Sequence, residues 1–188
     1  SNGSKSNNGK SKPMDAIALL KADHRKVEDL FETYENSKSK SVKAKLAQQI
    51  CMELTVHATI EEEIFYPAVK GQVEDDMLDE AYVEHDGAKV LIGELLAGTP
   101  EDDFYDAKVK VLSEEIKHHV KEEEQRDGIF AQAKKAGVDM MDLGEGLILS
   151  IVERVLSDRQ EELKTLERDT TILEAINSPF PRLHYDDA

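Results

Sequence analysis

The sequence predicts an all-α protein, an up-down-up-down four-helix bundle with an additional C-terminal helix and flexible tails. Apolar residues recur every three or four positions along four successive segments, and strict apolar-polar alternation, the sign of a sheet, is almost missing. Charged residues make up 34% of the chain and hydrophobic residues 39%, a balance typical of long amphipathic helices. Short connections between the segments favour antiparallel neighbours whose apolar stripes face one another.

Three parts are predicted within the 188 residues. Residues 1–11 are rich in Ser, Asn, Gly and Lys, and we expect a disordered leader there. Residues 12–137 are expected to form the bundle, and residues 138–188 a C-terminal helix followed by an extended tail. The leader lacks the charged-then-apolar pattern of a signal peptide.

The first two predicted helices are bounded by their capping residues. The first is expected to begin around Lys12-Pro13, because proline suits a first turn, and to end near Asn36-Ser37. Its predicted inner stripe is Ile17, Leu20, His24, Val27, Phe31 and Tyr34. The second is expected over about 41–66, closed by Pro67 and Gly71. Its predicted stripe is Leu46, Ile50, Glu53 or Leu54, His57, Glu61 and Ile64.

Two further bundle helices and one extra helix follow. The third is expected over about 74–96, with the stripe Leu78, Tyr82, His85, Lys89, Ile92 and Leu96. The fourth is expected to start at Thr99-Pro100, with Thr99 as cap, to be interrupted near Asp127-Gly128 and to stop at Gly137. Its stripe is Tyr105, Val109, Leu112, Ile116, His119 and Glu123. A fifth helix is expected over about 143–168, with the stripe Ile148, Val152, Val155, Arg159, Leu163 and Leu166.

Charge and cysteine content narrow the classes of function. The formal net charge of −16 disfavours nucleic acid and anionic membranes as partners, because both would be repelled. The single cysteine, Cys51, cannot form an intramolecular disulfide, which fits a reducing cytoplasm. No run of about 18 apolar residues is long enough to span a membrane. We therefore expect a cytoplasmic protein.

Histidines interrupt the apolar stripe of every predicted bundle helix. The chain has six: His24, His57, His85, His118, His119 and His184. In the fourth helix His119 is in phase with Leu112 and Ile116, whereas His118 points about 100° away. His119 is therefore the expected inward residue. One geometric difficulty is that His119 lies about twenty residues into the expected fourth helix, later than the other histidines lie in theirs.

Two of these histidines have a glutamate one turn later. His57 precedes Glu61 and His119 precedes Glu123 by four residues, a spacing that places both side chains on one helical face. With His24 and His85 they give six mixed nitrogen and oxygen ligands, too many for one tetrahedral zinc site. Six ligands suit two ions, and imidazole with carboxylate favours iron, with manganese or zinc as alternatives. A lone buried histidine is more often a hydrogen-bonded core residue, but burying six ionisable groups without a metal costs several kcal/mol each.

Several segments resemble the hemerythrin-like, or HHE cation-binding, family. They are 23–31 (DHRKVEDLF), 57–67 (HATIEEEIFYP), Glu84-His85, and 118–124 (HHVKEEE). The resemblance implies that His24, His57, Glu61, His85, His119 and Glu123 bind two iron ions, bridged by carboxylates and by an oxo or hydroxo group. It also implies reactivity with dioxygen, peroxide or nitric oxide, or alternatively a role in sensing or handling iron without turnover.

The sequence departs from that family at two places. Oxygen-carrying members have a histidine four residues after the third-helix histidine, where this chain has Lys89, so simple reversible oxygen carriage is not expected. After Glu123 the segment Gln125–Gly128 lengthens the chain, which leaves a His118–Glu122 register open beside His119–Glu123. His118 or Glu28 is eligible for a vacant ligand position, although Glu28 is expected to be solvated, and Lys89 either snorkels outward or donates to a bound anion.

Other functional classes remain open at this point. The ferritin-like carboxylate class expects Glu-x-x-His on two helices, and this chain offers one copy, Glu115 to His118. A metal-free helical interaction protein is the remaining alternative. A small diatomic molecule or peroxide is the expected ligand, and the C-terminal helix is a possible homodimer contact.

Overall fold

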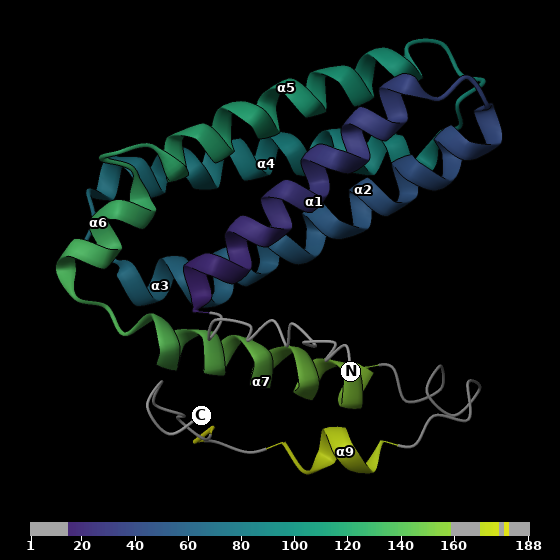
Figure 1. Cartoon of the computed structure of the whole chain (residues 1–188). Coiled ribbons are helices and arrows are strands. Elements are labelled where there is room, and N and C mark those ends of the chain that lie inside the picture. The colour runs from purple at the N-terminus through teal and green to yellow at the C-terminus, as the bar shows by residue number, and fades with distance from the viewer. Residues whose placement is uncertain (1–14, 159–169, 177–178, 181–188) are drawn as a thin grey trace, which may run out of the picture.

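The computed structural model describes residues 15–158, 170–176 and 179–180. Four long helices form an antiparallel bundle: α1 (Ala16–Asn36), α2 (Lys40–Ile60), α4 (Asp75–Ala97) and α5 (Tyr105–Glu124). Between α2 and α4 the chain forms a π-helix, η1 (Glu61–Phe65), and the short α3 (Tyr66–Val69). Figure 1 shows α1 packed beside α2, and α4 beside α5. The predicted all-α four-helix bundle is confirmed.

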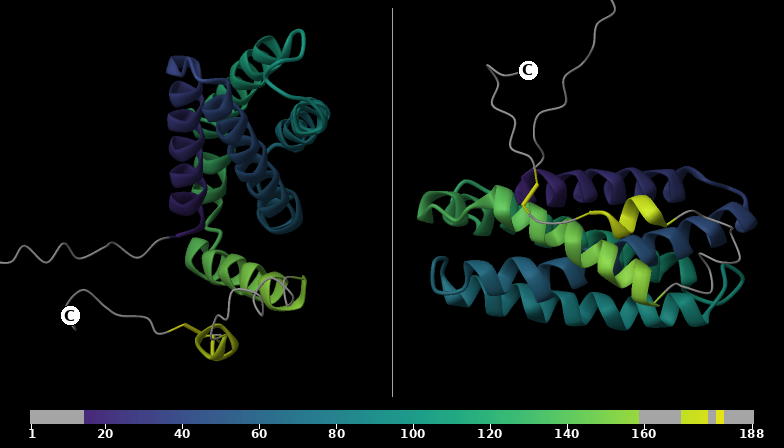
Figure 2. Two further views of the ribbon diagram at one scale, coloured as in Figure 1. Left: turned by 90° about the vertical axis from the view of Figure 1, so that its right-hand side faces the viewer. Right: turned by 90° about the horizontal axis from the view of Figure 1, so that it is seen from below.

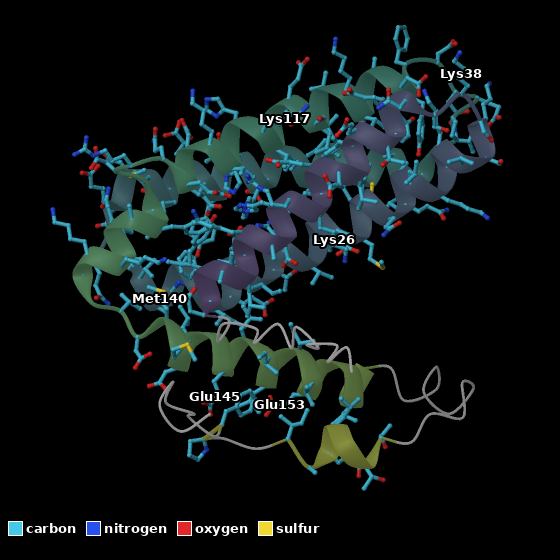
Figure 3. All side chains as sticks on the ribbon, in the orientation of Figure 1. Lys26, Lys38, Lys117, Met140, Glu145 and Glu153 are labelled. Atoms are coloured by element: carbon cyan, nitrogen blue, oxygen red, sulfur yellow. The ribbon has the colours of Figure 1, made fainter. Side chains whose placement is uncertain are left out.

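Within the part of the chain that the structure describes, three further helices follow the bundle. The first, α6 (Ile129–Ala136), closes one end of it, and α7 (Met140–Asp158) lies outside the four helices, where it contacts α1 and η1 (Figure 2). The short α9 (Thr171–Glu174) contacts α7. Side chains fill the space between the helices, and Met140 lies between the start of α7 and the bundle (Figure 3).

Two apolar clusters form the core, one toward each end of the bundle. One contains Leu20, Tyr66 and Leu78, together with Met140 and Leu147 of α7. The other contains Val27, Leu54, Ile92 and further residues nearer the α1–α2 connection. Along α1, His24 lies between Leu20 of the first cluster and Val27 of the second. The buried histidines therefore form a polar layer between two apolar ones.

The first two helices agree closely with the predicted pattern. All six residues of the expected α1 stripe are buried. Asp15 caps α1 by accepting from the backbone N–H of Ala18, and the expected start at Lys12-Pro13 lies outside the described residues. The second helix was expected to be closed by Pro67 and Gly71. Pro67 does not end it, because helical turns continue to Val69, but the helical segment does end before Gly71, which adopts a φ of 75°. The widened turn of η1 lies just before Pro67, where a regular helix would bring the proline ring against the preceding turn.

Half of the predicted inner face of α4 is confirmed, because Leu78, His85 and Ile92 are buried, but Tyr82, Lys89 and Leu96 each lie one position beyond the residue that is buried. The buried residues are Leu78, Ala81, His85, Ala88, Ile92 and Leu95. Tyr82 and Leu96, which were expected to point inward, are exposed. Two of the buried residues that the prediction missed are alanines, Ala81 and Ala88, whose small side chains give a weaker apolar signal than large ones.

The fourth bundle helix begins later than the sequence predicted. The N–H of Thr99 donates to the carboxylate of Asp102 in a turn, and α5 starts at Tyr105 after Phe104, which has a φ of 65°. His119 therefore lies fourteen residues after the start of α5, and His85 lies twelve before the end of α4. Measured from their shared connection, the two histidines are at similar depth, which removes the geometric difficulty that the sequence posed.

The helix after the bundle also differs from its predicted bounds. It begins at Met140 rather than near 143, because the carboxylate of Asp139 accepts from the N–H groups of Met141 and Asp142. It buries Met140 and Leu147, while Ile148 and Val152 of the expected stripe are only half-buried. The expected residues Arg159, Leu163 and Leu166 lie outside the described residues. The division into leader, bundle and C-terminal part stays a prediction. Within the described residues, no helix is long and apolar enough to cross a membrane.

Candidate metal centre

The structure brings all six predicted site residues together inside the bundle. They are His24 from α1, His57 from α2, Glu61 from η1, His85 from α4, and His119 and Glu123 from α5. None of them is more than 6% exposed. They form two groups of potential ligand atoms, one with His24, His57, Glu61 and Glu123, the other with Glu61, His85 and His119. Glu61 belongs to both groups.

The four imidazoles face the centre in two pairs. The Nε2 atoms of His24 and His57 are 2.9 Å apart, and those of His85 and His119 are 3.1 Å apart. The rings of each pair have centroids 4.6 Å apart. Each pair joins two helices, so that all four bundle helices contribute one imidazole nitrogen.

The two carboxylates lie between these pairs. Glu61 Oε2 is 3.2 Å from Nε2 of His57 and 3.4 Å from Nε2 of His85. Glu123 Oε2 is 3.3 Å from Nε2 of His24 and 3.6 Å from Nε2 of His119. Each carboxylate therefore reaches one ring of each pair, the arrangement needed to bridge two cations.

The outer nitrogens of three rings are held by a second layer of carboxylates. Nδ1 of His24 is 2.8 Å from Glu124, Nδ1 of His85 is 2.9 Å from Glu62, and Nδ1 of His119 is 2.8 Å from Glu84. For His57 the nearest carboxylate is Asp23, at 3.7 Å. A carboxylate accepts hydrogen bonds, so these Nδ1 atoms must donate, which turns the Nε2 lone pairs toward the centre.

This arrangement of donors fits a cation. At 2.9 Å and 3.1 Å, at most one nitrogen of each facing pair can carry a proton, because two N–H groups pointing at each other would collide. Among the described residues, Glu61 Oε1 and Glu123 Oε2 are buried without a hydrogen-bond partner. Buried oxygens without partners are expensive, and a metal ion bound by them and by the imidazole lone pairs removes that cost.

The electrostatics of the site favour positive charge within it. Burial by itself lowers the pKa of His57, but the carboxylates of Glu61 and Asp23 offset that effect and raise the pKa to about 10. Burial raises the pKa of Glu61, yet the surrounding imidazoles of His57, His119 and His85 hold it well below its usual value. Without a metal the site therefore retains protons, and cation binding must release them.

Tyr66 is a site residue that the sequence patterns did not single out. Its hydroxyl donates to Glu123 Oε1 at 2.9 Å and lies 3.4 Å from Glu61 Oε2. The wide turn of η1, in which the N–H of Tyr66 bonds to the carbonyl of Glu61, brings this side chain back over Glu61 five residues later. The sequence patterns also did not single out Glu62, Glu84 and Glu124. Their only sequence signal is that each is next to a predicted site residue.

The residues left open by the sequence are now placed. The side chain of His118 is 60% exposed and does not reach the centre, so His119 and Glu123 are the inward pair. Glu28 pairs with Arg25 on the surface of α1. Lys89 bonds to Glu62, at 2.7 Å from Oε1, the oxygen that also contacts His85. Phe130 of α6 stacks on His24 with 5.8 Å between ring centroids.

A cavity of about 120 Å³ adjoins the centre on the side of the second apolar cluster. All four histidines line it at one end. Its other walls are mostly aliphatic, from Val27, Leu54, Ala88, Ile92 and Ile116, and its other polar lining residues are Asp23, Thr55, Thr59 and Lys89. The cavity has room for a small molecule next to the imidazoles.

Comparisons with solved structures and curated proteins bear on the fold and on parts of the chain. The crystal structure of a hemerythrin HHE cation binding domain-containing protein from Mycobacterium kansasii is similar, with a TM-score of 0.63, 22% identity, and coverage of 86% of this chain and 99% of that chain. Asparagine–tRNA ligase of Chloroflexus aurantiacus is 54% identical over 50 residues, which are 27% of this chain and 11% of that protein. A DNA nickase of a Nostoc species is 30% identical over 106 residues, 56% of this chain and 30% of that protein. The chain thus spans only a small part of these curated relatives.

The match to a protein family covers most of the bundle and all six site residues. Residues 15–128 match the family described as Hemerythrin HHE cation binding domain. They run from the cap of α1 to the start of α6. The chain therefore belongs to the hemerythrin HHE cation binding domain family.

Proposed function

We propose that this protein binds two iron ions between its four bundle helices and reacts there with a small oxidant such as dioxygen, peroxide or nitric oxide. His24 and His57 would hold one ion, and His85 and His119 the other. Glu61 and Glu123 would bridge both. Manganese or zinc are alternative occupants of the same ligands.

One observation carries this proposal. Four Nε2 atoms and two carboxylates, none more than 6% exposed, converge from all four bundle helices, and a buried oxygen of each carboxylate has no hydrogen-bond partner among the described residues. Four imidazoles and two carboxylates leave ligand positions open on two ions with octahedral tendencies. Open positions are what a reactive centre needs and what a closed structural site lacks.

Bound iron would supply redox chemistry and Lewis acidity at the centre. The protein itself would orient the ligand side chains, supply a proton donor beside the centre and exclude water. The second-layer glutamates fix the three rings that they contact. The hydroxyl oxygen of Tyr66 lies 2.9 Å from Glu123 Oε1 and donates its proton to it, and the aliphatic cavity favours small, weakly polar ligands over bulky ones.

Anaerobic reconstitution tests the proposal. The metal-free full chain is titrated with ferrous iron, bound iron is counted, and the loaded protein is exposed to dioxygen or peroxide while visible absorption is followed. We expect two iron ions per chain and new absorption characteristic of a coupled diferric pair. If two ions bind but the absorption does not change on exposure to the oxidant, the proposed metal binding would be supported and the proposed reactivity refuted.

Iron sensing without turnover is the second candidate, and the position of α7 favours it. This helix contacts η1, the segment that contains Glu61, as well as α1, which contains His24. Binding of a metal by those residues would therefore stabilise the surface on which α7 packs. Limited proteolysis of the 137–188 region, with and without iron, separates the candidates. Protection by iron with no loss of added peroxide favours sensing, whereas unchanged cleavage with fast peroxide loss favours chemistry.

A further inference from the structure

A second group of potential metal ligands lies outside the buried centre, on the surface formed by α4 and α5. It consists of Glu84, His118 and Glu122, each of which offers one ligand atom within 4.8 Å of the others. Nδ1 of His118 is 3.0 Å from Glu84, and Nε2 of His118 is 3.5 Å from Glu122. An imidazole between two carboxylates is a ligand set that divalent transition metals accept.

A cavity lies between two residues of this group, Glu84 and Glu122, and two residues of the centre, His119 and Glu123. It measures about 110 Å³, and its walls include the carboxylates of Glu80, Glu84 and Glu122 on the outer side. On the inner side it is lined by His119 and Glu123 of the centre. Glu123 is 1% exposed, and its Oε2 has no hydrogen-bond partner among the described residues. A buried acceptor at the inner end of an acidic passage is a destination for a cation.

Glu84 links the two sites directly. Its Oε1 lies 3.0 Å from Nδ1 of His118 on the surface, and its Oε2 lies 2.8 Å from Nδ1 of His119 inside. The Glu84 carboxylate is thus the single group between a cation bound at its outer oxygen and the His119 ring of the buried centre.

The two cavities beside the centre have opposite chemistry. The aliphatic cavity extends along α4 toward Ala88 and Ile92, on one side of His85, and the acidic one toward Met77 and Ala81, on the other. A hydrated divalent cation that crossed the aliphatic cavity would lose its water with a single carboxylate, Asp23, to replace it and with Lys89 to repel it, which is costly. Carboxylates lining the acidic cavity could instead replace water ligands of a cation, and acid-lined clefts concentrate cations from solution.

We propose that Glu84, His118 and Glu122 form a surface site that captures a hydrated divalent cation and delivers it through the acidic cavity to the buried centre. This inference rests on the proposed function, since it assigns the route by which that centre is filled. The small oxidant then uses the aliphatic cavity, so metal and ligand reach the centre from different sides.

The rate of metal loading tests the proposal. Metal-free full-length protein is mixed with Co²⁺ in a stopped-flow instrument, and the visible absorption of Co²⁺ with imidazole ligands reports filling of the centre. The variant His118→Ala/Glu122→Gln removes two of the surface ligands and leaves Glu84, the partner of His119, in place. We expect loading about tenfold slower than in the wild type, within the range by which acidic clefts accelerate capture of cations. The final absorption amplitude is expected to be unchanged.

Glu114→Gln is the matched control, because it removes one carboxylate from an exposed position of α5 outside the group. Its loading rate is expected to stay within twofold of the wild type. Equal rates for the double variant and the control would overturn the proposal, as would a double variant with lost final amplitude, which would make these residues part of the centre. Absence of any Co²⁺ signal in the wild type would instead refute the proposed metal centre itself.

Discussion

The Nε2 atoms of His85 and His119 lie 3.1 Å apart, while Nδ1 of each ring contacts its own glutamate. The two glutamates, Glu62 and Glu84, come from η1 and α4, so each ring is held by a neighbouring helix. Because both outer nitrogens donate, the inner nitrogens present lone pairs to the same small volume. Folding the bundle therefore creates a site that is complete only with positive charge in it.

Glu62→Gln is expected to weaken iron binding about 10- to 100-fold without unfolding the protein, because a neutral amide leaves the His85 imidazole a poorer metal ligand. Glu62 also pairs with Lys89, so the substitution removes the negative charge that contacts both His85 and Lys89. Competition with a chelator of known affinity measures the change. Glu63→Gln, at the exposed neighbouring position of the same acidic run, is the control and is expected to bind iron like the wild type. Equal affinities for the two variants would contradict the assigned role of Glu62.

Removal of the metal is expected to lower the unfolding temperature. A ligand that binds only the folded state stabilises it by about 2.7 kcal/mol when its free concentration is one hundred times its dissociation constant. Here the stabilisation arises because the metal binds the buried oxygens of Glu61 and Glu123, which otherwise have no hydrogen-bond partner among the described residues. Calorimetry of iron-loaded and chelator-treated protein measures the difference. Identical unfolding curves would show that the folded protein holds no metal at this site.

Gly128→Ala is expected to destabilise the protein by about 1–3 kcal/mol, the usual range for an overpacked site. A Cβ at Gly128 would collide with the carbonyl oxygens of Glu122 and Glu123 at the end of α5. The α5–α6 turn must then open, which moves Phe130 off His24. Gly87→Ala is the control, since a Cβ there meets nothing within 4 Å on the exposed face of α4, and this change is expected to stabilise the protein by about 0.5–1 kcal/mol. Urea unfolding measures both, and equal effects would contradict the close approach at Gly128.

Asp106→Asn is expected to reduce stability by at most about 1 kcal/mol near neutral pH, since the side chain is partly exposed. The bond from Lys43, followed by that from Tyr34, holds the pKa of Asp106 below its usual 3.8. The folded state thus keeps this carboxylate ionised where the unfolded chain begins to protonate it. Its contribution is complete above about pH 3.8 and is lost as the pH falls through the lower folded pKa. Urea unfolding of both proteins from pH 7 to pH 3 should show the difference shrinking, and a pH-independent difference would contradict this account.

The sequence predicted the helices and the residues of the centre because both depend on local spacing. The apolar stripe of α1 and the four-residue steps from His57 to Glu61 and from His119 to Glu123 are properties of single helices. The choice of His119 over His118 followed from phase alone, and the structure agrees.

What the sequence did not predict depends on contacts between helices. Glu84 and Glu124 become partners of His119 and His24 only after α4 and α1 pack against α5. Tyr66 reaches Glu123 only because η1 has a widened turn, and the spacing of apolar residues in the sequence does not predict such a turn. Three positions on the inner face of α4 were misjudged, and at two of them the buried residue is an alanine, Ala81 or Ala88, which gives a weak apolar signal.

Anomalous diffraction from crystals of the iron-loaded protein tests the central claim most directly. Data collected on both sides of the iron absorption edge locate iron independently of the protein coordinates. The account predicts two peaks per chain, one beside Nε2 of His24 and His57 and the other beside Nε2 of His85 and His119, with carboxylate density from Glu61 between them. A single peak, or peaks only at other positions of the chain, would contradict it.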